Sequence, residues 1–333
     1  MRQSLQDQER LCGVDAALDE LVARRPPLTD IATSYALLLK ARLAASAALP
    51  KNSLLGADLS AQNLADNFLA AGRPLLSDIF AGLAKAEGEI VERFLTAAQE
   101  VLPATAQAFP RLAKDLARVA VLLDAQVTGE GKGVNLAAAL LAAIGPTAEN
   151  AATPKTIEDI AGEIGVEPAA VHMATTETLL ALLAHEGELL AGLVNQEAWR
   201  RNYCPVCGGG ADVGILKEGK EDSEFLIAKA GQLWLHCGQC ATLWRFPRLR
   251  CVACGCEDPA KMDMLLAEDD PRAEQERAHL CNECRTYSTT VNLVDRSDRV
   301  NLEMLPMTLL HLELLAQERG FSPLAPTPWN TLT

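Results

Sequence analysis

Cysteine is the residue type in this sequence best placed to do chemistry, because it recurs in pairs. Two cysteines separated by two residues can turn both sulfur atoms toward one point, and a tetrahedral metal ion takes four such sulfurs. Four pairs of this kind follow one another within residues 204–284. Their members are Cys204 and Cys207, Cys237 and Cys240, Cys251 and Cys254, and Cys281 and Cys284. The spacing therefore predicts two metal sites with these eight residues as ligands.

The order of the pairs favours joining the first pair with the second, and the third with the fourth. The stretches 208–236 and 255–280 that separate the joined pairs are similar in length. A cross-braced arrangement, in which the first pair joins the third, is also compatible with the spacing. In the first pair, Gly208 directly follows Cys207, so the backbone can pass close to the sulfurs and donate N–H groups to them. This pattern is typical of zinc ribbons and rubredoxin-type iron sites.

Four sulfur ligands leave a tetrahedral ion without an open position, so we do not expect the ion to activate a substrate. Zinc and iron both accept tetrahedral sulfur ligation. From the residues alone, structural zinc is slightly favoured and iron stays open. The sequence contains no P-loop, no Rossmann glycine pattern and no Gly-x-Ser-x-Gly elbow. We therefore expect no catalytic residues and no enzymatic activity.

Composition limits the partners and compartments that the chain could have. The formal net charge of −14 argues against a general nucleic-acid binder, since phosphate contacts need clustered lysine and arginine. The first ten residues lack the apolar stretch of a secretory signal, and the longest apolar run, near 136–144, is too short to cross a bilayer. We expect a cytoplasmic protein without a membrane span. In that reducing compartment, paired cysteines are metal ligands or redox thiols rather than disulfides.

Apolar residues recur at helical spacing throughout the first two hundred residues, which predicts an all-α domain. Long helices are expected from Thr29 to just before Pro50, from Pro74 until Pro103 ends the helix, and over 168–194. Shorter helices are expected between them. One of these begins at a capping box formed by Thr156 and Asp159.

After residue 199, glycine, cysteine and short β-like runs (225–228, 233–236 and 289–294) replace the helices. Small modules of this kind bury too little apolar surface to be stable alone, so each needs an additional stabilising element such as a metal ion. A helix follows over 302–318, and the proline-rich tail is expected to be loosely ordered. The predicted fold is α+β and multidomain. Its parts are an all-α domain (1–198), two four-cysteine modules of rubredoxin-like or zinc-ribbon-like type (199–245 and 246–300), and a C-terminal helix and tail (301–333).

The stretch between the second and third cysteine pairs is rich in arginine and aromatic residues, which is unusual in so acidic a chain. One interpretation is a hinge, in which Trp244 and Phe246 pack between the modules and the arginines meet the acidic residues 268–270. The other is a docking surface, because tryptophan and arginine are enriched at interface hot spots. The candidate partner-binding residues are Trp244, Arg245, Arg248 and Arg250.

These motifs together resemble the FdhE family of formate dehydrogenase accessory proteins. Three runs carry the resemblance: Arg-x-x-Cys-Pro-Val-Cys-Gly from Arg201, Leu-His-Cys-x-x-Cys-x-x-x-Trp-x-x-x-Arg-x-x-Cys-x-x-Cys from Leu235, and Cys-x-x-Cys-x-x-Tyr from Cys281. The resemblance extends to Asp295-Arg296 and to the run Glu-Arg-Gly-Phe that begins at Glu318. It also fits the helical first half of the chain.

The resemblance implies a cytoplasmic protein needed for assembly or maturation of respiratory formate dehydrogenase, acting on its catalytic subunit. It also implies rubredoxin-like modules that hold iron, with the eight paired cysteines as ligands. Cys256 departs from the pattern, and could be a spare ligand, although a small turn residue is the interpretation we favour. The alternatives are a zinc-ribbon nucleic-acid-binding protein that uses Arg245, Arg248 and Arg250, and an iron redox or electron-transfer protein.

Overall fold

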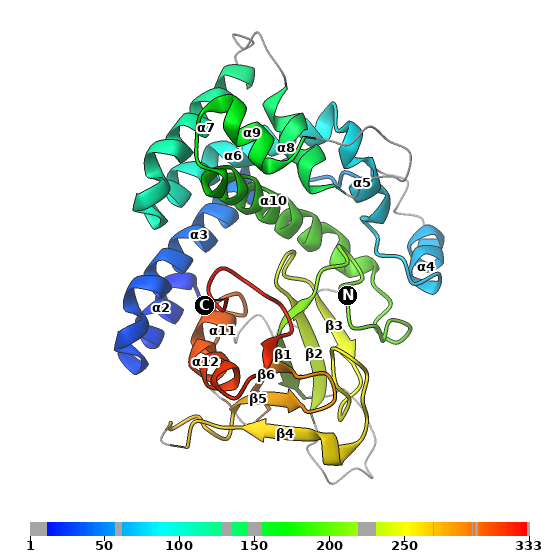
Figure 1. Ribbon diagram of the computed structural model, residues 1–333. Coiled ribbons are helices and arrows are strands. Elements are labelled where there is room, and N and C mark those ends of the chain that lie inside the picture. Colours follow the sequence, from blue (N-terminus) through cyan, green and yellow to red (C-terminus); the bar gives the residue numbers. More distant parts are fainter. Residues whose placement is uncertain are drawn as a thin grey trace. The chain divides into compact units, whose positions relative to one another are not determined.

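The computed structural model describes residues 12–56, 62–127, 135–145, 155–218, 231–268, 270–294, 296 and 299–331. The chain divides into two compact units (Figure 1). One consists of Thr29–Ala65 and Leu75–Leu190 and is helical. The other consists of Met1–Leu28, Asp66–Pro74 and Ala191–Thr333 and contains the sheet. The α+β fold predicted from the sequence is confirmed: a helical N-terminal region precedes a mixed sheet that carries two four-cysteine clusters.

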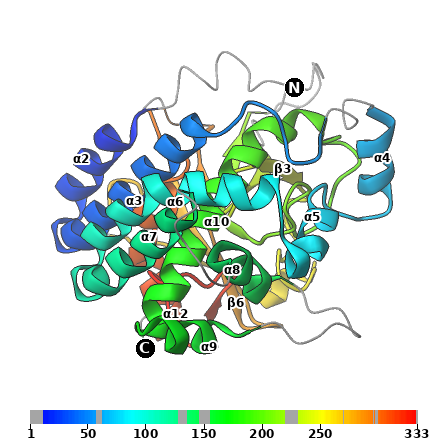
Figure 2. The ribbon, with the colours of Figure 1, turned by 90° about the horizontal axis from the view of Figure 1, so that it is seen from above.

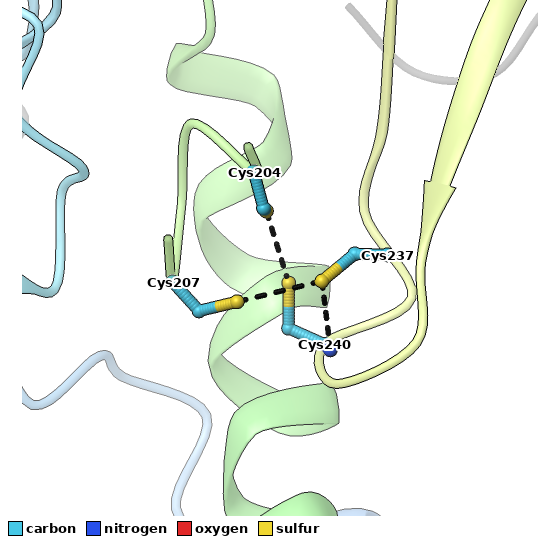
Figure 3. Close-up of side chains that lie close together, drawn as sticks. All are labelled: Cys204, Cys207, Cys237 and Cys240. Carbon is cyan, nitrogen blue, oxygen red and sulfur yellow. Dashed lines mark hydrogen bonds between the residues drawn. The ribbon is translucent and has the colours of Figure 1, made fainter. Parts of the chain in front are cut away.

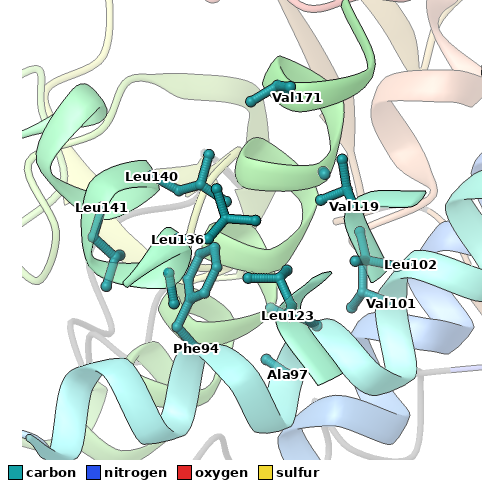
Figure 4. Close-up of a cluster of buried hydrophobic side chains, with 14 of the residues drawn as sticks. Phe94, Ala97, Val101, Leu102, Val119, Leu123, Leu136, Leu140, Leu141 and Val171 are labelled. Carbon is teal, nitrogen blue, oxygen red and sulfur yellow. The ribbon is translucent and has the colours of Figure 1, made fainter. Parts of the chain in front are cut away.

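Three long helices organise the helical unit: α3 (Thr29–Ala48), α6 (Glu89–Ala108) and α10 (Pro168–Leu190). Each of them packs against the other two, and α7 (Ala113–Val127) lies alongside α6 (Figure 2). The core between them is mostly aliphatic and surrounds the buried ring of Phe94, with Val119, Leu123 and Leu140 fully buried (Figure 4). The shorter helices are α4 (Gln62–Ala70), which continues into the other unit, α5 (Ser77–Gly82), α8 (Leu136–Ile144) and α9 (Ile157–Ile164).

Two helix boundaries predicted from the sequence are wrong, and one helix start is confirmed. Pro103 lies inside α6 instead of ending it. Its ring and Gln99 are on the exposed face of the helix, so the carbonyl that loses its N–H partner is open to water. The helix expected from Pro74 is interrupted between α5 and α6. A 3-10 turn over Leu83–Lys85 ends at the extended residue Ala86, and Gly88, with a φ of 62°, directly precedes α6. The capping box of Thr156 and Asp159 is present at the start of α9.

The second unit is built on a seven-stranded sheet in the order β3-β2-β1-β6-β5-β4, with β7 also paired to β6. The first three strands are antiparallel to one another, and so are β4, β5 and β6. β1 and β6 run parallel, which joins the two cysteine modules into one sheet. The strands are β1 (Ala211–Lys217), β2 (Gln232–Cys237), β3 (Leu243–Phe246), β4 (Met262–Leu265), β5 (Glu276–Cys281), β6 (Thr286–Asn292) and β7 (Ser322–Pro323).

A close backbone approach makes the parallel junction possible. Gly214 of β1 lies opposite Thr290 of β6, and a Cβ atom on this glycine would stand 2.8 Å from the Thr290 hydroxyl oxygen. Of the β-like runs expected from the sequence, 233–236 lies in β2 and most of 289–294 lies in β6. The run 225–228 lies outside the described residues.

Two short helices, α11 (Leu305–Thr308) and α12 (Leu310–Glu318), cover one face of the sheet (Figure 1). Strand residues alternate between the two faces, and those on the covered face form an apolar core with the helices. Val213, Ile215 and Leu280 pack there with Leu309 and Leu312. The opposite face of the sheet borders a cavity.

As far as residue 331, where the described part of the chain ends, the C-terminal tail is held by specific contacts, so the expectation of loose order is wrong for these residues. β7 pairs with β6, and the backbone N–H of Leu324 donates to the Tyr287 carbonyl at 3.0 Å. Asn330 is buried, and its side chain donates to the Ala325 carbonyl at 3.1 Å. Gln317 of α12 donates to the Asn330 carbonyl at 2.7 Å. These polar contacts fix the position of the tail, to which few apolar residues contribute.

Helix α2 (Val14–Arg24) precedes the helical unit but belongs to the sheet unit. Arg24 donates to Glu276 at 2.8 Å and to Asp270 at 3.1 Å, and Arg25 also pairs with Asp270. The acidic residue Asp270 therefore meets these two arginines and not the arginines of the linker. The four-part division at residues 198, 245 and 300 stays a prediction. Within the described ranges, no helix is long and apolar enough to span a membrane.

Candidate metal centres

The first cluster brings together Cys204, Cys207, Cys237 and Cys240 (Figure 3). All four side chains are buried and converge from two turns, one before β1 and one between β2 and β3. The sulfurs of Cys204 and Cys240 lie 3.4 Å apart, as do those of Cys207 and Cys237. Four sulfurs placed tetrahedrally at about 2.3 Å from an ion are separated by about 3.8 Å. The cluster thus has nearly the dimensions that a tetrahedral ion requires.

A residue with a left-handed backbone conformation follows each cysteine pair and lets the chain turn beneath the sulfurs. Gly208 has a φ of 83° and Ala241 a φ of 57°. Gly208 donates its N–H to the Cys204 carbonyl at 2.9 Å, which closes the turn. The next N–H, of Gly209, then points at the Cys207 sulfur at 3.3 Å. Backbone N–H groups that donate to thiolates orient them and stabilise their charge.

The second cluster repeats this arrangement with Cys251, Cys254, Cys281 and Cys284. The sulfurs of Cys251 and Cys284 lie 3.7 Å apart, and those of Cys254 and Cys281 also 3.7 Å. Positive φ angles again follow each pair, at Gly255 (75°) and at Arg285 (57°). The pairs are therefore joined in sequence order, and the cross-braced arrangement is not observed. Unlike the first cluster, this one is open to solvent, because Cys254 is exposed and Cys284 is half-buried.

The first turn of each cluster, 204–209 and 251–256, is closed by the same backbone hydrogen bond, and this explains the position of Cys256. The N–H of Cys251 donates to the Cys256 carbonyl at 2.8 Å, as the N–H of Cys204 donates to the Gly209 carbonyl at 2.8 Å. Cys256 thus stands where Gly209 stands in the first cluster, and its sulfur is not among the four that converge. Its interpretation as a turn residue is confirmed.

In each cluster the pKa of one sulfur is lowered, whereas the pKa of another is raised. Burial raises the pKa of Cys237, and it raises the pKa of Cys251 to about 12. Burial also opposes ionisation of Cys240 and Cys284, but hydrogen bonds from neighbouring thiols and from Thr242 or Thr286 lower their pKa values, that of Cys284 to about 7. Four thiolates without a cation would repel one another. A bound cation removes that cost, so metal binding releases protons.

Sequence reasoning missed the hydroxyl beside each of these two sulfurs. The Thr242 hydroxyl lies 3.2 Å from the Cys240 sulfur, and Thr286 occupies the same position after Cys284. The signal was present in the sequence, because the run Cys-x-x-Cys-x-Thr occurs in the second and fourth pairs. These hydroxyls are positioned to donate to a thiolate and tune its charge.

A buried ion pair next to the first cluster was also missed. His236 lies in β2, as the sequence predicted, and its Nδ1 atom is 2.8 Å from the Asp212 carboxylate of β1. Burial lowers the pKa of His236, but the Asp212 carboxylate more than offsets this and raises it. The Nδ1 atom of His236 is therefore engaged with the Asp212 carboxylate, and the histidine is not one of the converging ligand residues.

The linker residues divide into one buried side chain and three basic ones. Trp244 is fully buried, and its indole N–H donates to the Arg201 carbonyl at 2.9 Å. Arg245 pairs with Glu197. Arg248 donates to the Gly231 carbonyl at 3.1 Å, and Arg250 lies 3.6 Å from Glu257. Trp244 thus packs inside its own unit, and contact with a partner through Arg245, Arg248 and Arg250 stays a prediction.

The fold and the clusters define the class of this protein: a helical unit joined to a mixed sheet with two four-cysteine sites that could hold metal ions. No family model matches the chain. It is 31% identical over 126 residues to the "Protein FdhE homolog" of Aquifex aeolicus, which is 38% of this chain and 40% of that protein. It is 27% identical over 129 residues to the homolog of Shewanella oneidensis, which is 39% of this chain and 38% of that protein.

The chain spans about two-fifths of the length of these curated relatives. The crystal structure of the FdhE protein from Pseudomonas aeruginosa has the same fold, with a TM-score of 0.58 and 20% identity over 98% of this chain and 96% of that one. The sequence relatives and the shared fold together support the FdhE family, as the sequence motifs predicted.

Proposed function

We propose that this chain is a cytoplasmic accessory protein that takes part in the maturation of respiratory formate dehydrogenase by binding its catalytic subunit. The observation that supports this most directly is the pair of complete four-sulfur clusters on one sheet. The family resemblance supplies the client, since the names of the relatives do not state it.

The clusters favour a binding function over an enzymatic one. In each cluster four sulfurs lie close enough to surround one ion, which leaves no position for a substrate. Each cluster also links the turn before one strand to the turn at the end of a β-hairpin strand. An ion held there would stabilise the shape of the sheet surface without taking part in bond making.

Iron is the metal we propose for both sites, on the family resemblance, and zinc is the alternative. The ligands would be the eight paired cysteines, and the N–H groups and threonines around them would stabilise thiolate charge with either ion. Metal analysis and an optical spectrum of protein purified without oxygen distinguish the two. We expect two iron ions per chain and a coloured protein. A colourless protein with two zinc ions would contradict the iron assignment and leave the binding function in place.

The binding function is tested by recovering the client with tagged protein. In a strain that makes formate dehydrogenase, the tagged chain should carry the catalytic subunit with it and restore enzyme activity when its own gene is deleted. Replacing Cys204 and Cys207 by serine should reduce both. Cys256→Ser is the matched control, because Cys256 lies in the same unit of the chain but its sulfur belongs to neither cluster. Unchanged recovery and activity in the double variant would remove the role of the first site.

Electron transfer is a second candidate function, because one side of the second cluster is exposed. Cys254 is exposed, so an ion bound there would lie close to the surface. An iron site of this kind should bleach reversibly on one-electron reduction. A spectrum that does not respond to reductant would exclude this candidate.

A further inference from the structure

The sheet face opposite α11 and α12 borders a cavity of about 500 Å³, which we call the sheet groove. Its floor consists of strand residues that alternate with those of the buried core, among them Gly214, Leu235 and Thr290. Its walls include the linker after β3 and the edge strand β4. Cavities of this size, with an apolar floor and a few polar groups, are typical of binding sites.

Three arginines line the groove in a chain whose net charge is −14: Arg248, Arg250 and Arg277. Arg248 donates to the Gly231 carbonyl, and Arg277 donates to the Glu274 carbonyl at 2.6 Å. Neither of these two guanidinium groups pairs with a carboxylate of the described residues.

The third arginine of the groove is only loosely paired, since Arg250 lies 3.6 Å from the exposed Glu257. The two carboxylates of the lining already have partners. Asp212 pairs with His236, and Asp263 accepts from Asn282 at 2.8 Å. The three arginines therefore outnumber the two carboxylates of the lining, and the groove carries an excess of positive charge.

Apolar side chains stand beside these charges. Leu249 is 86% exposed and has a φ of 57°, a conformation that non-glycine residues seldom adopt. Met264 of the edge strand β4 is 50% exposed. A flexible methionine adapts to different partners. An edge strand also has backbone N–H and C=O groups that can pair with an added extended segment.

We propose that the sheet groove binds a short extended segment of a protein partner, in which carboxylates flank an apolar side chain. The carboxylates would meet Arg248 and Arg277, and the apolar side chain would contact Met264. A long polyanion such as nucleic acid fits less well, because the net charge of the chain, −14, repels it over its whole length. The proposal deepens the proposed function and rests on it, since the partner is the catalytic subunit of formate dehydrogenase.

Photo-crosslinking in the full chain tests the proposal. Met264→p-benzoylphenylalanine places the reactive group in the groove, and Leu314→p-benzoylphenylalanine places it on α12, on the other side of the sheet, where Leu314 is 37% exposed. We expect a crosslink to the catalytic subunit from position 264 alone, to a segment that contains aspartate or glutamate. A crosslink from position 314 alone, or from 264 to nucleic acid, would overturn the proposal.

Charge reversal gives an independent measurement. Arg248→Glu with Arg277→Glu should lower the recovered catalytic subunit about tenfold or more, because both guanidinium groups would be replaced by repelling charges. Arg299→Glu makes the same change at an exposed residue outside the groove and should leave recovery unchanged. Metal content and circular dichroism show whether the variants are folded, and Arg248→Gln with Arg277→Gln provides a milder pair.

The outcomes separate this inference from the proposed function. If the unaltered chain does not recover the catalytic subunit, both fail together. If it recovers the subunit equally well with and without the groove arginines, and position 264 gives no crosslink, the binding function holds and the sheet groove is not its site.

Discussion

At the scale of residues, the eight paired cysteines were predictable because their geometry is local. Two residues between ligands fix a turn, and the turn fixes where the sulfurs point. Asp212 could not be found in this way, since only the pairing of β1 with β2 brings it to His236. Thr242 and Thr286 were partly predictable. The repeated run Cys-x-x-Cys-x-Thr indicates that both threonines belong to the sites, but it does not show that their hydroxyls lie beside Cys240 and Cys284.

The two sites should release their metal ions at different rates, because they differ in how far their ligand cysteines are exposed to solvent. Cys254 and Cys284 are accessible, whereas Cys204, Cys207, Cys237 and Cys240 are all buried. With excess chelator and a metal-sensitive dye, we expect one ion per chain to leave quickly and the other slowly. Cys254→Ser should abolish the fast phase and keep the slow one. Release of both ions in one phase would show that burial does not control access.

Glu313 should give the sheet unit a stability that depends on pH. Burial raises the pKa of this carboxyl to about 7, and the nearby Asp212 carboxylate adds to the effect. The folded state thus holds a proton that the unfolded state, with a pKa near 4.5, has lost. The stabilisation from this group is fully present below pH 4.5 and declines as the pH rises through 7.

The comparison with Glu313→Gln isolates this effect. Relative to the glutamine variant, the unaltered protein should lose about 1–3 kcal/mol of unfolding free energy between pH 5 and pH 8. Urea unfolding of both proteins, with metal present, measures the difference. A difference that stays constant over this pH range would show that Glu313 titrates normally.

At the scale of elements, helices were easier to predict than strands. Helices such as α6 and α7 carry a periodic apolar pattern over many residues, whereas β1 is buried on both sides along most of its length and shows no alternation. The end of a helix was less predictable, because whether Pro103 breaks α6 depends on which face of the helix it occupies. The tail was unpredictable because polar contacts from α12 hold it.

A buried ion pair should contribute strongly to the helical unit. Arg93 of α6 lies 3.1 Å from Glu186 of α10, and their side chains are 2% and 1% exposed. Arg93→Met keeps much of the volume but leaves the Glu186 carboxylate without its cation, which should cost about 3 kcal/mol. Lys155→Ala removes the exposed pair with Glu163 and should cost less than about 0.5 kcal/mol. Similar urea midpoints for the two variants would contradict this.

Metal removal should loosen the sheet and spare the helices. Each cluster ties the turn before one strand to the turn that follows β2 or β5. Hydrogen exchange of protein stripped of metal should therefore show faster exchange in β2, β3, β5 and β6. The amides of α3, α6 and α10 should keep their protection. Equal loss in both units would mean that the metals stabilise the chain as a whole.

At the scale of the whole molecule, the sequence predicted an α+β chain with two cysteine modules but not that these form one sheet. The parallel pairing of β1 with β6 joins residues more than seventy positions apart, and no local pattern indicates it. The same junction creates the open face on which the sheet groove lies. A partner would thus meet a surface whose shape depends on both clusters.

Each chain should hold two separate four-cysteine metal sites, and native mass spectrometry tests this most directly. The unaltered chain should carry two metal ions. Replacing Cys204 and Cys207 by serine should leave one ion, replacing Cys251 and Cys254 should also leave one, and Cys256→Ser should keep two. A single ion in the unaltered chain, loss of both ions from either double variant, or masses that show disulfides in place of metal would contradict the account.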